Sequence, residues 1–217
     1  MKIEILYPEI CTLYGDKGNT MYLQKCLPDA EFVTTGLNEK PLFLRENIDM
    51  VYMCSMSEKS QELVLDRLMQ YKDEIAACMK DGKALFLLVG NSMELLGDYI
   101  KREDGTRVTG LGVVPGMYSV RQAPNRFNTL IKAKFNDMTL IGYTSRFAHT
   151  YGIPEDMTFC KVEIGQGSNP DTMNEGICKN RVIATYIHGP LLIQNPDFVH
   201  YLLKRLDAPM KEIPFEA

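Results

Sequence analysis

The stretch LFLLVGNSMELLG, from Leu85 to Gly97, sets the fold class. Its first half continues an apolar run from Ala84 that is typical of a central parallel strand buried on both faces. The run breaks at Gly90-Asn91 and resumes with the pattern of a helix. Such a turn exposes one residue at the carboxyl edge of the sheet, where open α/β sheets place their sites. Because that residue is a glycine, the stretch is either an ordinary turn or a site that lacks its reactive side chain.

The residues before this stretch predict strands alternating with helices. Strands are expected at Lys2–Tyr7, Glu31–Gly36 and Asp49–Cys54. One helix is expected at Thr20–Leu27, with Asn19 or Thr20 as its N-cap. A longer amphipathic helix is expected between Ser57 and Lys80, where apolar residues recur every three or four positions. This order indicates an α/β fold with a flavodoxin-like, doubly wound sheet.

The residues after the stretch predict mostly strands. Segments divided by Gly, Asn and Pro are expected to form strands within 107–120, 127–135, 138–144, 159–167 and 176–189, with a hairpin turn at Lys179-Asn180. A last helix is expected over 195–206, with Asn195 as N-cap and Pro196 in its first turn. No repeat or linker interrupts the chain, so we expect a single domain over residues 1–217 with a β-rich second half.

The composition excludes several classes of protein. The 217 residues are 45% hydrophobic and 24% charged, as in ordinary soluble proteins. A net charge of −4 and the lack of a basic stripe argue against nucleic-acid binding. No apolar run approaches the ~18 residues of a membrane span, and no export signal is recognisable, so we expect a cytoplasmic protein without membrane insertion. The six cysteines and three histidines show no metal-ligand spacing, and we expect neither a metal nor a cofactor.

A second candidate segment is VIATYIHGPLL, Val182 to Leu192, in which an apolar strand ends at His188. A histidine just past a strand end is placed to act as a general base, although a lone histidine is more often a surface or core residue. The expected helix after Gly90 offers free backbone N–H groups near Asn91, which favour an anion.

Three separated segments together resemble one family. They are LYPEICTLYGDKGN (Leu6 to Asn19), GNSMELLG (Gly90 to Gly97) and TYIHGPLLIQNP (Thr185 to Pro196). In this order they are similar to class I glutamine amidotransferase domains of the cobyric-acid-synthase type. Within that family the chain resembles the glutaminase subunits of lipid II isoglutaminyl synthase, which amidates peptidoglycan precursors.

The resemblance implies a glutaminase that works as one half of a heterodimer. In such enzymes an elbow cysteine attacks the glutamine side-chain amide, and ammonia leaves for a partner synthase that resembles a Mur ligase. Carried over to this chain, His188 would activate the nucleophile and Asp16 would orient His188.

The chain departs from the family pattern at three places. Gly90 occupies the elbow, so no thioester can form there. The family's glycine-rich oxyanion loop is replaced by a segment with Cys54 and Ser55, whose backbone N–H groups approach a substrate less easily. In YTSRFAHTY, Tyr143 to Tyr151, His149 stands at the family's arginine position and Arg146 lies close by. The candidate catalytic positions are therefore His188, Asp16 and the vacated Gly90, and the candidate substrate-binding residues are Asn91, Cys54, Ser55, Arg146 and His149.

Three functional hypotheses follow. The first is a pseudoenzyme, an amidotransferase-like subunit that binds a Mur-ligase-like synthase but does not hydrolyse glutamine; glutamine or another small ligand is the candidate occupant of its cleft. The second is an active glutaminase that recruits another thiol, for which Cys54 is the candidate; its alternative is a buried hydrophobe. The third is a free-standing module that binds an anion or nucleotide through the Asp16 loop and the Gly90-Asn91 turn.

Overall fold

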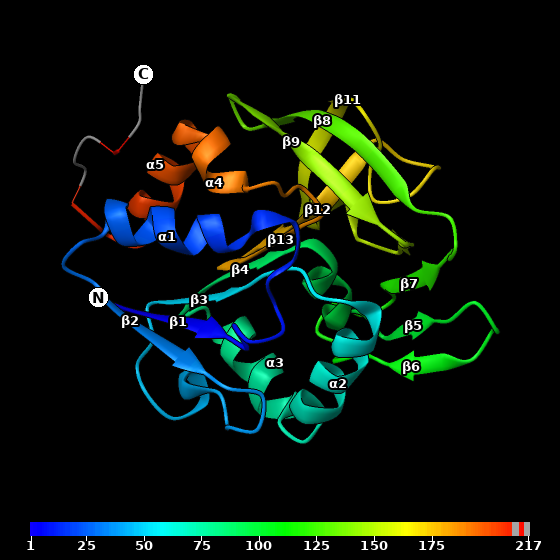
Figure 1. Cartoon of the computed structure of the whole chain (residues 1–217), viewed down its shortest axis with the longest axis horizontal. Helices are drawn as coiled ribbons and strands as arrows, with labels where there is room; N and C mark the ends of the chain where they lie inside the picture. Colours follow the sequence, from blue (N-terminus) through cyan, green and yellow to red (C-terminus); the bar gives the residue numbers. More distant parts are fainter. Residues whose placement is uncertain (210–212, 215–217) are drawn as a thin grey trace.

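A computed structural model describes residues 1–209 and 213–214 as two β-sheets, the larger covered by helices on both faces (Figure 1). Within the described residues, the larger sheet has nine strands in the order β2-β1-β3-β4-β13-β12-β11-β8-β9. The smaller sheet has four, in the order β10-β7-β5-β6. Residues 210–212 and 215–217, the end of the domain expected over 1–217, lie outside the described residues, and the single-domain organisation stays a prediction.

Five strands of the larger sheet run parallel: β1 (Lys2–Leu6), β2 (Glu31–Thr35), β3 (Met50–Met53), β4 (Leu85–Val89) and β13 (Val182–Thr185). Every residue of β3, β4 and β13 is buried, as expected for strands covered on both faces. Helix α1 (Lys17–Cys26) lies on one face, and α2 (Glu58–Met69) and α3 (Lys72–Asp81) lie on the other (Figure 1). The predicted α/β fold with a doubly wound sheet is confirmed.

The other strands of the larger sheet are antiparallel and form the predicted β-rich half. They are β12 (Asn174–Lys179), β11 (Thr158–Ile164), β8 (Phe127–Phe135) and β9 (Met138–Arg146). The sheet curls, because Tyr143 of the edge strand β9 pairs through its backbone with His188, just after β13. Helices α4 (Leu191–Gln194) and α5 (Pro196–Arg205) pack beside β9. Phe198 of α5 contacts Phe135 and Phe159 in the core of this half.

The smaller sheet contains β5 (Tyr99–Lys101), β6 (Arg107–Thr109), β7 (Tyr118–Arg121) and β10 (Ala148–Tyr151). Neither β5 nor β10 is predicted from the sequence, and the segment expected as one strand over 107–120 forms two short strands. Three tyrosines stack across the sheet in register: Tyr99, Tyr118 and Tyr151. The short helical turns elsewhere are η1 (Leu13–Gly15), η2 (Leu42–Leu44), η3 (Gly90–Leu96) and η4 (Glu155–Met157).

The long helix predicted between Ser57 and Lys80 is two helices. The chain leaves helical geometry at Tyr71 (φ −112°), between α2 and α3. Buried Leu68 and Ile75 lie on either side of this break, so the apolar periodicity continues through it and does not reveal it. No helix in the described part of the chain is long and apolar enough to cross a membrane.

Three helical segments also differ from the prediction at their starts. Helix α1 begins at Lys17 with Asp16 at the N-cap position, because the side chain of Asn19 is used elsewhere: it donates to Tyr52 and accepts from the backbone of Leu192. The segment after Gly90 is a 3₁₀ helix, η3, rather than an α-helix. Asn195 does precede α5, with Pro196 in the first turn, but its side chain bonds the backbone of Ile141 instead of capping the helix.

Candidate functional site

The parallel strands bring four of the predicted site residues to one edge of the sheet. Asp16 follows β1, Ser55 follows β3, Gly90 follows β4 and His188 follows β13. The carboxyl ends of parallel strands meet at the same edge, where α/β sheets bind their ligands. All four residues are buried, so this candidate site is closed to solvent.

Gly90 follows β4 directly and begins η3. Its φ of +71° lies in the left-handed region that favours glycine. A Cβ built on Gly90 would lie 2.8 Å from Cβ of Ser55 and closer still to its Oγ. Real Cβ atoms essentially never make such contacts. The space that a nucleophile's side chain needs is therefore filled by Ser55.

Ser55 is held in this place by Asp16. The Ser55 hydroxyl donates to Asp16 Oδ2 at 3.0 Å, and the Ser55 backbone N–H approaches the same oxygen at 3.4 Å. Burial raises the pKa of Asp16 to about 6, against the opposing effect of hydrogen bonds from Ser55 and from the backbone N–H of Gly189. Asp16 thus bonds the residue that fills the elbow.

His188 makes its contacts on the other side of the site. Its Nε2 accepts the backbone N–H of Ser145 at 2.9 Å, and its ring stacks on Tyr14 with centroids 4.5 Å apart. Burial lowers the pKa of His188 to about 4, so the ring is neutral at pH 7, and its proton lies on Nδ1 because Nε2 accepts a hydrogen bond. Nδ1 has no hydrogen-bond partner in the described part of the chain. The Asp16–His188 hydrogen bond implied by the family resemblance is therefore not formed.

The Cys54 thiol is engaged by the backbone of Cys11. It donates to the backbone carbonyl of Cys11, and burial raises the pKa of the thiol far above its ordinary value. A reactive cysteine needs a lowered pKa and access to substrate. Cys54 has neither, which matches the buried-hydrophobe alternative.

Asn91 uses its side chain within the protein. Its amide accepts from the backbone N–H of Met56 at 3.0 Å and donates to the Met56 carbonyl at 2.8 Å. This pairing ties the loop after β3 to the turn after β4. It fixes the segment in which Ser55 lies and leaves the Asn91 amide engaged.

Arg146 and His149 lie in the interior rather than at an open surface. The Arg146 guanidinium donates to the Gly167 carbonyl and lies 4.2 Å over the ring of Tyr186. Burial lowers the pKa of Arg146, and the nearby carboxylates of Glu175 and Glu94 oppose that effect. His149 packs on Phe127, with ring centroids 4.0 Å apart. The structure places both residues among buried groups, and a substrate-binding role for them stays a prediction.

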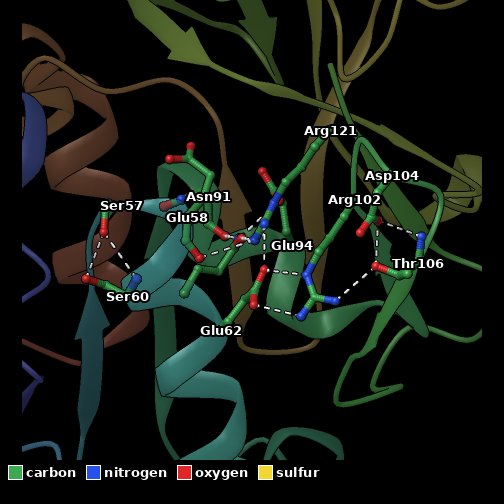
Figure 2. A network of polar contacts seen from close by, with 11 residues as sticks. Ser57, Glu58, Ser60, Glu62, Asn91, Glu94, Arg102, Asp104, Thr106 and Arg121 are labelled. Atoms are coloured by element: carbon green, nitrogen blue, oxygen red, sulfur yellow. Dashed lines mark hydrogen bonds and ion pairs between the residues drawn. The ribbon is translucent and has the colours of Figure 1, made fainter. Parts of the chain in front are cut away.

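A network of polar contacts that sequence reasoning missed borders the site (Figure 2). Glu62 of α2 pairs with Arg121 at 2.6 Å and with Arg102 at 2.8 Å. Gln61 accepts from Arg121 and donates to the carbonyl of Asn91 and to Glu94. The network thereby links the smaller sheet and α2 to the turn that contains Gly90. The one signal in the sequence is Glu94, a charged residue inside the apolar run SMELL.

Buried neutral histidines make the stability of the protein sensitive to acid. The pKa of His149 is lowered from 6.5 to about 4 by burial and by the charge of Arg146. A histidine whose pKa is lowered by folding contributes stability above pH 6.5, and this stability is lost as the pH falls through 4. The His149→Phe variant should therefore resist acidification better than the wild type, by about 2 kcal/mol between pH 7 and 4.5. Urea unfolding at both pH values measures this, and an equal pH dependence in both proteins would contradict it.

The comparison with protein families agrees with this geometry. Residues 2–196 match the CobB/CobQ-like glutamine amidotransferase domain. The chain belongs to this family. Among the residues that the structure describes, no group of three or more His, Cys, Asp or Glu side chains is arranged to hold a metal ion.

The relatives of this CobB/CobQ-like domain include two curated proteins of known name. The chain is 26% identical to the lipid II isoglutaminyl synthase (glutamine-hydrolyzing) subunit GatD of Streptococcus pneumoniae (strain ATCC BAA-255 / R6), over 94% of this chain and 79% of that protein. It is 27% identical to the protein of the same name from Staphylococcus aureus (strain N315), over 94% and 83%. The predicted resemblance to GatD-like glutamine amidotransferase domains is confirmed.

Solved structures show the same fold. A crystal structure of a glutamine amidotransferase has a TM-score of 0.60 and 12% identity, and the match covers 94% of this chain and 99% of that one. The structure of PurLQS from Thermotoga maritima has a TM-score of 0.59 and 12% sequence identity, and the match covers 86% of each chain. At these identities the likeness concerns the fold alone.

Proposed function

We propose that this chain is a glutamine amidotransferase-like subunit that does not hydrolyse glutamine. The observation that carries the proposal is the occupation of the elbow: Ser55 fills the volume in which the side chain of a nucleophile would stand at position 90. Without a thiol at that point, the side-chain amide of glutamine has no atom to attack it.

The surroundings of the elbow support the same proposal. His188 is a poor general base for this reaction, because Nε2 already accepts a hydrogen bond and its pKa of about 4 leaves little proton affinity at pH 7. Asp16 bonds Ser55 instead of orienting His188. Base, orienting acid and nucleophile position are thus each committed to contacts within the protein.

The partner follows from the relatives. The two curated relatives are named as subunits of lipid II isoglutaminyl synthase. By this relationship we propose that the chain binds a synthase subunit resembling a Mur ligase, in the amidation of peptidoglycan precursors. The chain would act there as a structural or regulatory partner rather than as a source of ammonia.

The two other hypotheses lack a supporting observation. An active glutaminase using Cys54 needs an accessible thiolate, whereas the Cys54 thiol is buried against the Cys11 carbonyl with a raised pKa. An anion-binding module needs free donors at the Gly90-Asn91 turn. The Asn91 amide is paired with Met56, and the neighbouring acidic residue Asp16 disfavours an anion.

We expect no ammonia release when the purified chain is given L-glutamine, and no adduct after incubation with 6-diazo-5-oxonorleucine, an electrophilic glutamine analogue. Enzymatic ammonia detection and intact-protein mass spectrometry measure the two outcomes. A Cys54→Ser variant is the control, because it separates an adduct on Cys54 from one on another cysteine. Ammonia release above the no-enzyme rate, or an adduct that Cys54→Ser abolishes, would contradict the proposal.

A further inference from the structure

The outer face of the antiparallel half carries an exposed apolar patch. In strands β8, β9 and β11, the side chains of Leu130, Ile141 and Ile164 are 72%, 48% and 60% exposed. The strand register places them together: Leu130 lies opposite Tyr143 of β9, and Lys132 lies between Ile141 on one side and Ile164 on the other. Grouped apolar side chains of this size on one face mark interaction sites far more than scattered ones do.

The same face has an uncompensated positive charge. Lys134 and Lys161 lie directly opposite each other in register, and like charges at such positions destabilise a sheet. In the described part of the chain no carboxylate pairs with either lysine, whereas Lys132 pairs with Glu163 at 3.0 Å. A carboxylate brought in by a partner would relieve the repulsion.

The charges also discriminate between occupants. A second copy of this chain docked through a twofold axis would bring two faces with the same excess positive charge together, which is unfavourable. An anionic membrane surface attracts clusters of about four to eight basic residues. This face offers two unpaired lysines in a chain of net charge −4, so it fits a membrane poorly.

The patch also adjoins the candidate site. Tyr143, which faces Leu130 across the strands, packs edge-on against His188 with ring centroids 5.6 Å apart. A partner seated on Leu130 and Tyr143 would therefore lie beside the candidate site.

We infer that the outer face of β8, β9 and β11 is the docking surface for a second protein subunit whose contact surface has an apolar centre and acidic side chains at its rim. The occupant is the synthase subunit of the proposed function, so the inference rests on that assembly, but it does not depend on whether glutamine is hydrolysed.

The test is site-specific photocrosslinking of the full chain in its native cells. The photoreactive residue p-benzoylphenylalanine replaces Leu130 or Ile164, and in control variants it replaces Leu63 of α2 or Met21 of α1, which are 40% and 55% exposed and lie on helices. We expect Leu130 and Ile164 to give a crosslink to one polypeptide of the Mur-ligase-like synthase class, identified by mass spectrometry. The control positions should give at least tenfold less. Reversing the two lysines (Lys134→Glu with Lys161→Glu) should weaken the crosslink at least fivefold.

Several outcomes would overturn the inference. They are a crosslink to the chain itself, equal crosslinking at the control positions, no crosslink at all, or binding to phosphatidylglycerol vesicles that Leu130→Asp abolishes. A glutaminase assay of the same preparations reports separately on the proposed function. If the protein is active and gives the expected crosslinks, the docking surface is supported and only the proposed loss of glutamine hydrolysis is contradicted.

Discussion

The Gly90→Cys variant should be strongly destabilised when it is made alone. Combining it with Ser55→Gly should recover most of the lost stability. The single variant forces a Cβ into contact with Ser55 and places a non-glycine residue at φ +71°. Overpacking and the left-handed conformation together should lower the free energy of unfolding by about 3 kcal/mol or more. Removing the Ser55 side chain vacates the space beside position 90. It should recover most of the unfolding free energy that is lost to overpacking.

The measurement is a double-mutant cycle of unfolding free energies, together with labelling by 6-diazo-5-oxonorleucine. The combined variant should regain stability relative to Gly90→Cys alone, and neither variant should carry an adduct, because the site is closed to solvent and His188 is a poor base. Gly105→Cys is the matched control, because Gly105 has a φ of +85° but no atom within 4 Å of its Cβ position, so it reports the backbone strain alone. Equal stability of Gly90→Cys and Gly105→Cys would show that Ser55 does not block the elbow.

The Arg146→Met variant should be the most destabilised of the conservative changes in the β-rich half. Arg146 is 3% exposed and lies near the buried carboxylates of Glu175 and Glu94. Methionine keeps the contact with Tyr186 but removes the positive charge of Arg146, whose Coulomb attraction favours these carboxylates. Breaking a buried charge cluster in this way costs about 3 kcal/mol or more at pH 8.

The loss of unfolding free energy in Arg146→Met should become smaller as the pH falls. Burial raises the pKa of Glu175 and of Glu94, and loss of the arginine raises it further. A carboxylate with a raised pKa is tolerated in the fold when protonated and destabilises it as the pH rises. Urea unfolding at pH 8 and pH 5.5 measures the change. Arg126→Met is the control, since Arg126 also lies over an aromatic ring, that of Phe147, but is exposed. An equal loss in the two variants would contradict the prediction.

The sequence predicts the fold well where one pattern dominates. The continuous apolar run at β4 has a single physical explanation, and the observed strand β8 (Phe127–Phe135) has the predicted bounds. The sequence does not predict the break at Tyr71, because both helices present apolar residues to the same core and the apolar pattern continues from one to the other. The start of α1 is not predicted because Asn19 satisfies a tertiary hydrogen bond instead of a cap.

The site is predicted in part. The order of the parallel strands explains why Asp16, Ser55, Gly90 and His188 meet, whereas the sequence indicates this grouping only through the family resemblance. The sequence does not predict that Ser55 fills the space beside Gly90, because the distance between two loops depends on tertiary packing rather than on a local pattern. The pairing of Asp16 with Ser55 replaces the expected pairing with His188 for the same reason.

The backbone link between Tyr143 and His188 closes the curl of the larger sheet, and the imidazole completes it by accepting from Ser145 and packing on Tyr14. His188 therefore has a structural role that does not depend on glutamine hydrolysis. A TYIHG-type motif alone does not establish that a chain of this family is an active glutaminase. The residue that follows β4, here Gly90, is the one that indicates whether a nucleophile is present.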